Sequence, residues 1–222
     1  MAPAAASDSS NRAVCVMDAL GHLGTSLAER LLPKGYTVHA ALQKHGESRL
    51  GGISFDKKKL KVFNLDPFDY RSILDALKGR SGLFYSFEPP QDQPNYDEHM
   101  TEVGVRAAHN VLEACARTET IDKVVFTSSA TAVLWRNDRK STTLDLDLDL
   151  DERHWTDVNF CQSFKLWHAL SKTLAEKTAS ALAMDRSLNM VSMSVGSLMA
   201  PRKLPILLCH FSGNYVLDIL RL

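Results

Sequence analysis

A serine, a histidine and a lysine have the residue types and the spacing of a site that reduces a carbonyl group. Ser129 closes the apolar run 123–128, and His168 and Lys172 lie four residues apart in a helical pattern, so both project from one face of that helix. In such a site the serine hydroxyl would hold the carbonyl oxygen, the residue at 168 would protonate it, and the lysine would bind a ribose and tune the donor. These three residues are the candidate catalytic residues.

Histidine is an acid or a base that works near neutral pH. A neighbouring Lys172 ammonium would lower the pKa of His168 and leave the imidazole mostly neutral, with one hydrogen bond to donate. Two interpretations of His168 are open at this point. It is either a working proton donor or a partly buried helix residue without a chemical role.

A loop with two glycines joins the first apolar run to the first helical pattern. It reads Asp18-Ala19-Leu20-Gly21-His22-Leu23-Gly24, and glycines at 21 and 24 would let backbone N–H groups approach a dinucleotide pyrophosphate at a helix N-terminus. Asp18 stands where the first glycine of such a loop belongs. At ~4 Å its carboxylate would repel a phosphate by about 1 kcal/mol in water and about 4 kcal/mol near a protein surface. Asp18 is also a good helix cap, and this is the alternative interpretation.

The segment after the second apolar run carries no acidic residue that would bind ribose hydroxyls. It reads Gln43-Lys44-His45. Lys44 suits a 2′-phosphate, which favours NADP, or it is an ordinary solvated lysine. The expected cofactor contacts are Asp18, Gly21, His22, Leu23, Gly24, Gln43, Lys44, Asn64, Leu65 and Lys172.

Apolar strand patterns alternate with helical patterns along most of the chain. We expect strands over 13–17, 36–42, 60–65, 82–87, 123–128 and 189–195, and helices over 20–32, 69–77, 96–117 and 164–183. This alternation predicts an α/β fold, a doubly wound parallel sheet with helices on both faces. Sites in such folds lie at the carboxyl ends of the strands, where the residues above would meet.

A length of 222 residues favours one dinucleotide-binding domain, which we expect over 12–201. Residues 1–11 are predicted to be a disordered tail. Four Leu-Asp pairs over 144–151 indicate a low-complexity loop over 140–152. Residues 202–222 show no clear pattern and are expected to form a separate tail.

The composition argues against several classes of protein. Lys plus Arg and Asp plus Glu both number 26, which disfavours nucleic-acid binding through bulk charge. No apolar run reaches the ~18 to 20 residues that span a bilayer, and the first residues lack a signal-peptide core, so we expect a cytoplasmic protein without a membrane partner. The cysteines form no C-x-x-C pair and the histidines are scattered, so reduced thiols and no metal site are expected. The cysteines are Cys15, Cys115, Cys161 and Cys209.

Three segments are specific when taken together: 110–115 (NVLEAC), 123–129 (KVVFTSS) and 167–177 (WHALSKTLAEK). They resemble the plant cinnamoyl-CoA reductase and dihydroflavonol 4-reductase group of the extended short-chain dehydrogenase/reductase superfamily, over roughly residues 12–201. The resemblance implies a Rossmann-like fold, NADP(H) as cofactor and a phenylpropanoid or flavonoid carbonyl as substrate. It also implies a Ser-Tyr-Lys triad, whose serine is Ser129 and whose lysine is Lys172.

The chain departs from this group at several functional positions. His168 stands at the position of the tyrosine, Asp18 at the first loop glycine, and Gln43 at an arginine often used for the 2′-phosphate. The segment 85–89 is bulkier and more acidic than the small residues of the group. Members of the group also continue beyond the aligned region with the rest of a substrate lobe.

Two functions are therefore predicted. The first is an NADP-dependent reductase of the cinnamoyl-CoA reductase type, acting on a phenylpropanoid-type CoA thioester, aldehyde or ketone. The second is a catalytically impaired relative with a binding or regulatory role or none. Without a substrate lobe the mouth of the sheet would expose apolar surface, which predicts self-association.

Overall fold

The computed structural model describes residues 12–19, 21–43, 58–88, 96–135, 155–195 and 209–211. Its strands are β1 (Ala13–Met17), β2 (Thr37–Gln43), β3 (Leu60–Leu65), β4 (Gly82–Tyr85), β5 (Lys123–Ser129), β6 (Met190–Val195) and β7 (Cys209–Phe211). Its helices are α1 (His22–Leu31), α2 (Tyr70–Leu77), α3 (Glu98–Ala116), α4 (Thr131–Leu134), α5 (Val158–Ser163) and α6 (Trp167–Asp185).

The strands form one sheet in the order β3-β2-β1-β4-β5-β6-β7. Strands β1 to β6 are parallel to their neighbours, whereas β7 pairs antiparallel with β6. The predicted doubly wound α/β fold is therefore confirmed. The chain order reverses direction between β1 and β4, and folds of this class bind their ligands at such a switch point.

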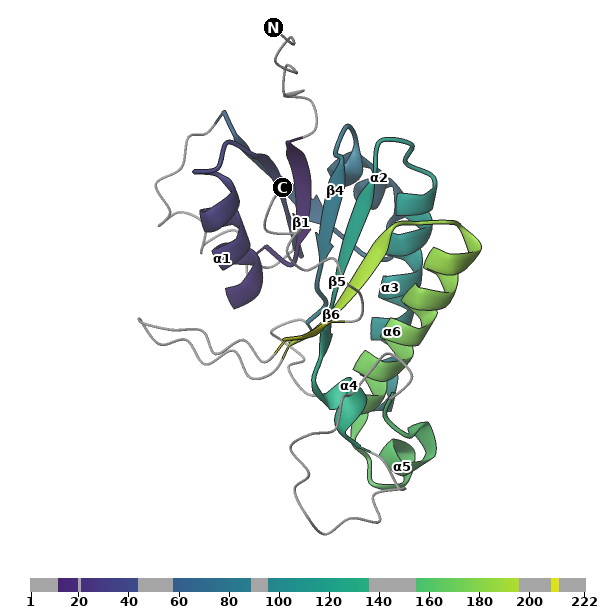
Figure 1. Ribbon diagram of the computed structural model, residues 1–222. Coiled ribbons are helices and arrows are strands. Elements are labelled where there is room, and N and C mark those ends of the chain that lie inside the picture. The colour runs from purple at the N-terminus through teal and green to yellow at the C-terminus, as the bar shows by residue number, and fades with distance from the viewer. Residues whose placement is uncertain are drawn as a thin grey trace, which may run out of the picture.

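Strand β1 shows why the sheet is buried on both faces. Its successive side chains alternate between the faces. Val14 and Val16 belong to the apolar cluster on the α1 side, and Cys15 and Met17 belong to the cluster that includes residues of α2, α3 and α6. Figure 1 shows α1 on one face of the sheet and α3 and α6 on the other. Burial on both faces explains an apolar run with no polar alternation.

Aspartates begin three of the helices. The carboxylates of Asp69, Asp97 and Asp157 accept backbone N–H bonds at the starts of α2, α3 and α5, which is the usual N-cap arrangement. Helix α1 differs, because its N-cap is Gly21 and no side chain caps it. The alternative prediction that Asp18 caps this helix is therefore wrong.

The helix predicted over 164–183 begins later, because a turn separates α5 from α6. Lys165 lies in that turn with a φ of 53°, and α6 starts at Trp167 and ends at Asp185. Strand β7 was not predicted and lies beyond residue 201. Lys44, residues 1–11, the loop 140–152 and the rest of the tail 202–222 lie outside the described residues.

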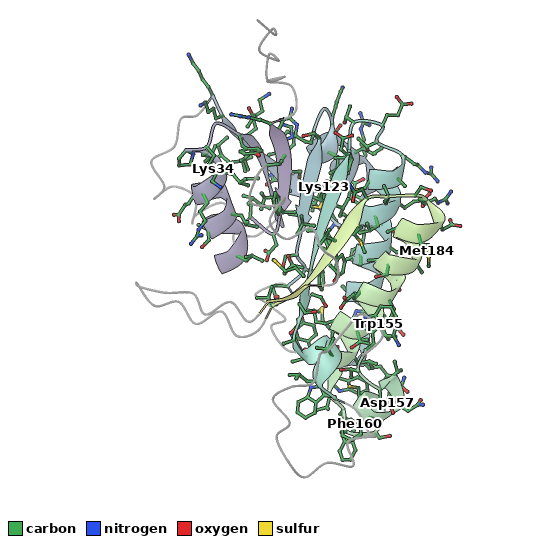
Figure 2. The ribbon with its side chains drawn as sticks, viewed as in Figure 1. Lys34, Lys123, Trp155, Asp157, Phe160 and Met184 are labelled. Carbon is green, nitrogen blue, oxygen red and sulfur yellow. The ribbon has the colours of Figure 1, made fainter. Side chains whose placement is uncertain are left out.

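The two ends of β5 mark the two ends of the sheet. Figure 2 shows Lys123, where β5 begins, far from Trp155, Asp157 and Phe160, which lie beyond its carboxyl end beside α4 and α5.

Cys15, Cys115 and Cys161 are free and buried. Within the described ranges, none of the helices is long and apolar enough to cross a membrane, and no cluster of His, Cys, Asp and Glu is arranged to hold a metal ion.

Candidate active site

A cleft of about 660 Å³ opens at the carboxyl ends of the central strands. It takes residues from the turns after β1 and β4, from the end of β5 and the start of α4, from α6, and from the end of β6. The residues that line it are Asp18, Gly21, Leu23, Ser86, Glu88, Thr127, Ser128, Ser129, Ala130, Thr131, Leu134, His168, Lys172 and Val195. The three predicted catalytic residues thus meet in one cleft.

Thr131 connects Ser129 to His168. The Thr131 hydroxyl lies 3.0 Å from Ser129 Oγ and 3.1 Å from His168 Nδ1, and the Thr131 backbone N–H also donates to Ser129 Oγ at 3.3 Å. Because Ser129 Oγ accepts from Thr131, its own proton is left to donate to another acceptor. The sequence reasoning missed Thr131, since nothing in its spacing relates it to residue 168.

The imidazole of His168 is held in a partly buried position. Its ring packs edge-on against Tyr96, with 4.6 Å between ring centroids and an interplanar angle of 85°. Burial lowers the pKa of His168, and the Lys172 ammonium lowers it further, while Glu88 opposes both. The predicted direction is confirmed, although burial contributes more than the lysine does. At neutral pH the ring is therefore mainly uncharged.

Lys172 is buried, and its ammonium is turned towards the segment after β4. Its Nζ donates to the carbonyl oxygen of Phe87 at 2.5 Å and to Glu88 Oε1 at 3.2 Å. An ammonium has three protons, so one is left for a further acceptor. Contact between Lys172 and a ribose stays a prediction.

Glu176 anchors α6 to the sheet one turn beyond Lys172. Its two carboxylate oxygens accept hydrogen bonds from Ser128 Oγ of β5 and Ser192 Oγ of β6, each at 2.6 Å. All three side chains are buried. This clamp fixes the helix that carries His168 against the strand that carries Ser129.

The loop after β1 keeps the backbone form of a glycine turn although its first residue is Asp18. Asp18 has a φ of 61°, a conformation that glycine adopts freely and that aspartate tolerates better than most residues. A Cβ on Gly24 would lie 2.2 Å from the Asp18 carbonyl oxygen, so only glycine fits there. The loop and α1 thus pack as closely as a dinucleotide site requires.

The carboxyl of Asp18 lies over the start of α1. The Gly21 N–H donates to the backbone carbonyl oxygen of Asp18 at 3.1 Å, and a Cβ on Gly21 would meet Asp18 Oδ2 of the carboxyl at 2.5 Å. Burial, and then the negative charge of Glu88, raise the pKa of Asp18 to about 7, against the opposing effects of the Lys172 charge and the nearby Gly21 N–H. The backbone therefore fits a dinucleotide, and the charge at Asp18 fits one when that carboxyl is protonated.

The other predicted cofactor contacts divide into two groups. Leu23 lines the cleft with Asp18 and Gly21, whereas Asn64 is exposed on β3 and Leu65 is buried in the core, and neither lines the cleft. His22 begins α1 and Gln43 ends β2.

Three exposed apolar side chains lie at the ends of α4 and α5. Leu134 and Trp135 are each 40% exposed and Phe164 is 64% exposed. Leu134 itself lines the cleft. Self-association through this surface stays a prediction.

The sequence family described as the 3-beta hydroxysteroid dehydrogenase/isomerase family matches residues 15–189. The chain belongs to this family. The match lies within the extended short-chain dehydrogenases/reductases that the sequence resembles. The matched region contains the loop, Ser129, His168 and Lys172.

Named relatives are plant reductases. Tetraketide alpha-pyrone reductase 1 of Arabidopsis thaliana is 31% identical over 96% of this chain and 65% of its own length. Cinnamoyl-CoA reductase 1 of Petunia hybrida is 32% identical over 82% of this chain and 53% of its own length. This confirms the resemblance to the cinnamoyl-CoA reductase and dihydroflavonol 4-reductase group.

The crystal structure of vestitone reductase from alfalfa (Medicago sativa L.) has a similar fold. It superposes with a TM-score of 0.69 at 30% identity, over 82% of this chain and 56% of that one. The chain thus spans about half to two thirds of the length of these relatives.

Proposed function

We propose that this chain is an NADP-dependent reductase of the cinnamoyl-CoA reductase type, with a phenylpropanoid-type carbonyl as substrate. The observation that carries the proposal is the hydrogen-bond chain from Ser129 through Thr131 to His168, at 3.0 and 3.1 Å. This chain joins a hydroxyl donor and a titratable ring beside the carboxyl end of β5. Family membership and the plant reductase relatives support the substrate class.

The reaction needs a donor that holds the carbonyl oxygen and then protonates it as negative charge develops there. When bound, NADPH would supply the hydride. Ser129 Oγ donates to the carbonyl oxygen, and its proton is replaced from Thr131 Oγ1. The Thr131 proton is replaced in turn from Nδ1 of a protonated His168, which is left as neutral imidazole.

This relay predicts a pH dependence. The pKa of His168 is lowered, so the imidazolium that starts the relay is scarce at neutral pH. The rate of the chemical step should rise as the pH falls towards the pKa of His168, which lies below the ordinary value of about 6.5.

The test is reduction of a panel of phenylpropanoid CoA thioesters, aldehydes and ketones with NADPH. Thr131→Val keeps the shape but breaks the relay, so kcat should fall by about 10²-fold or more with little change in KM. Thr118→Val is the matched control, because Thr118 follows the end of α3, its hydroxyl donates to the Ala114 carbonyl, and it does not line the cleft. Equal kcat in both variants would contradict the relay.

The second candidate is a relative that binds a ligand without catalysis. It is favoured by the substitution of the family tyrosine with His168 and by the engagement of Lys172 with Glu88. His168→Tyr combined with Asp18→Gly restores both family residues. If this double variant reduces the panel while the native chain does not, the binding function is the correct one. If neither reduces any compound, the carbonyl-reductase assignment of the site fails.

A further inference from the structure

We propose that the Asp18 carboxylate is an internal anion that occupies the phosphate position of the cofactor loop, so that dinucleotide binding is coupled to protonation of this side chain. The proposal rests on the proposed function in one respect, the use of a dinucleotide by this fold. It adds a gate on the cofactor that the three candidate catalytic residues do not provide.

The position of the Asp18 carboxyl at the start of α1 is the first step of the argument. In dinucleotide-binding loops, the backbone N–H groups at the start of the first helix receive a phosphate. Here the Asp18 carboxyl lies against Gly21 at that position, since an added Cβ on Gly21 would meet Asp18 Oδ2 at 2.5 Å, and no side chain caps α1. Asp18 also lines the cleft beside Leu23. An incoming phosphate and this carboxylate would therefore compete for the same space at the start of α1.

The backbone carries the second step. The φ of 61° at Asp18 and the close contact of Gly24 with the Asp18 carbonyl keep the turn that the glycine residue would make. Compared with a glycine at this position, Asp18 adds a side chain but leaves the backbone path the same. Removing or neutralising the carboxylate should therefore leave a loop already shaped for the cofactor.

The surroundings carry the third step. Asp18 is faced by the Glu88 carboxylate from the segment after β4, by Lys172 from α6, and by the buried phenols of Tyr85 and Tyr96. Lys172 Nζ forms an ion pair with Glu88 Oε1 at 3.2 Å. Among the described residues, no ion pair joins Lys172 to Asp18. The carboxylate is thus held near a second negative charge with no cation of its own.

These surroundings set the pH range in which Asp18 becomes protonated and allows a dinucleotide to bind. Burial and Glu88 raise the pKa of Asp18 to about 7, so both charge states are present at neutral pH. The neutral form admits a phosphate and the ionised form repels it. Affinity for a dinucleotide should therefore increase as the pH falls through 7, whereas an ordinary surface carboxyl stays ionised in this range and would give no change.

The experiment measures the fluorescence of NADH as it binds to the full chain at a series of pH values. NADH is preferred because its pyrophosphate stays ionised, whereas a phosphate monoester such as the 2′-phosphate of NADPH titrates near ~6. If only the protonated form binds, the dissociation constant rises about tenfold between about pH 6 and about pH 8, given a pKa of about 7. In Asp18→Asn the constant should be independent of pH and equal the low-pH value of the native chain.

Asp75→Asn, an exposed position on α2, is the matched control and should behave as the native chain. A second measurement needs no variant. At pH 7 the native chain should take up about half a proton per NADH bound, read from calorimetry in buffers of different ionisation enthalpy. Proton uptake on binding, together with the tenfold change in the dissociation constant of NADH, would support the coupling of dinucleotide binding to protonation of Asp18.

Three results would overturn the proposal that protonation of Asp18 controls dinucleotide binding. Binding that is independent of pH in the native chain, or uptake of no proton, removes the gate and leaves the proposed reductase function intact. A dissociation constant of Asp18→Asn that follows pH as the native one does assigns the titration to another group. If neither the native chain nor Asp18→Asn nor Asp18→Gly binds NADH or NADPH at any pH while all remain folded, the cofactor assignment fails together with the gate.

Discussion

The clamp formed by Glu176, Ser128 and Ser192 permits a quantitative prediction of stability. Each serine hydroxyl donates to a carboxylate oxygen at 2.6 Å, and the three residues are only 4 to 9% exposed. Hydrogen bonds to charged groups contribute about 1.5 to 3 kcal/mol each. Ser128→Ala and Ser192→Ala should therefore each lower the free energy of unfolding by about 1.5 to 3 kcal/mol.

Glu176→Ala removes both carboxylate oxygens at once. The buried hydroxyls of Ser128 and Ser192 lose their acceptor, and a cavity forms where the side chain stood. We expect a loss of about 3 to 5 kcal/mol, the range for breaking a buried charged pair or emptying a core position. Glu176→Gln keeps the shape and one carbonyl oxygen. A serine hydroxyl facing the amide nitrogen can rotate to accept instead of donate, so this variant should lose less than half as much.

The assay is urea-induced unfolding of the full chain, with double-mutant cycles that combine Glu176→Gln with each serine variant. A coupling energy of about 1 kcal/mol or more is expected for both serines, because each contacts Glu176 directly. Additive effects in both cycles would refute the clamp, as would equal losses in Glu176→Gln and Glu176→Ala. The slope of the transition should stay constant across the series, which checks that the unfolded state is unchanged.

Three further predictions follow from the cleft. Gly24→Ala places a Cβ 2.2 Å from the backbone oxygen of Asp18 and should lower the melting temperature sharply, whereas Gly82→Ala, with its nearest contact at 3.4 Å, should be far milder in the same thermal scan. Glu88→Gln removes a charge that raises the pKa of Asp18, so the midpoint of pH-dependent NADH binding should move to lower pH; an unchanged midpoint would contradict the proximity of the two carboxyls. The folded-state pKa of Asp18 is raised from 3.8 to about 7, so its contribution to stability is full below 3.8 and is lost as the pH rises through 7. Asp18→Asn should therefore raise the melting temperature at pH 8 more than at pH 4, and the reverse order would show that the carboxyl is not buried as described.

Much of the fold follows from local sequence patterns. The run 13–17 predicts a buried strand because both of its faces are covered, and the alternation of strands and helices leaves few possible connections. The boundary at α5 and α6 was missed because a left-handed residue, Lys165, breaks a segment whose apolar pattern continues. Strand β7 was missed because three residues give too short a pattern to recognise.

The candidate site was predicted in its chemistry but not in its contacts. Ser129, His168 and Lys172 meet because the strand ends and the face of α6 meet in this fold. Thr131 depends on how α4 turns after β5, and Glu88 on the segment beyond β4, so neither could be related to the site from spacing. The cap predicted at Asp18 failed because the chain turns sharply there and the N-cap position falls three residues later, at Gly21.

The pairing of β1 with β4 also has a consequence for how the chain folds. Val14 pairs with Gly82, so the middle of the sheet is joined by contacts between residues far apart in sequence, and such contacts form slowly. The strands β1 to β3 can assemble from the first part of the chain and β4 to β6 from the second, and the cleft exists only where the two halves join. A bound dinucleotide would therefore report completed assembly, and ligand binding during refolding should appear as a late kinetic phase.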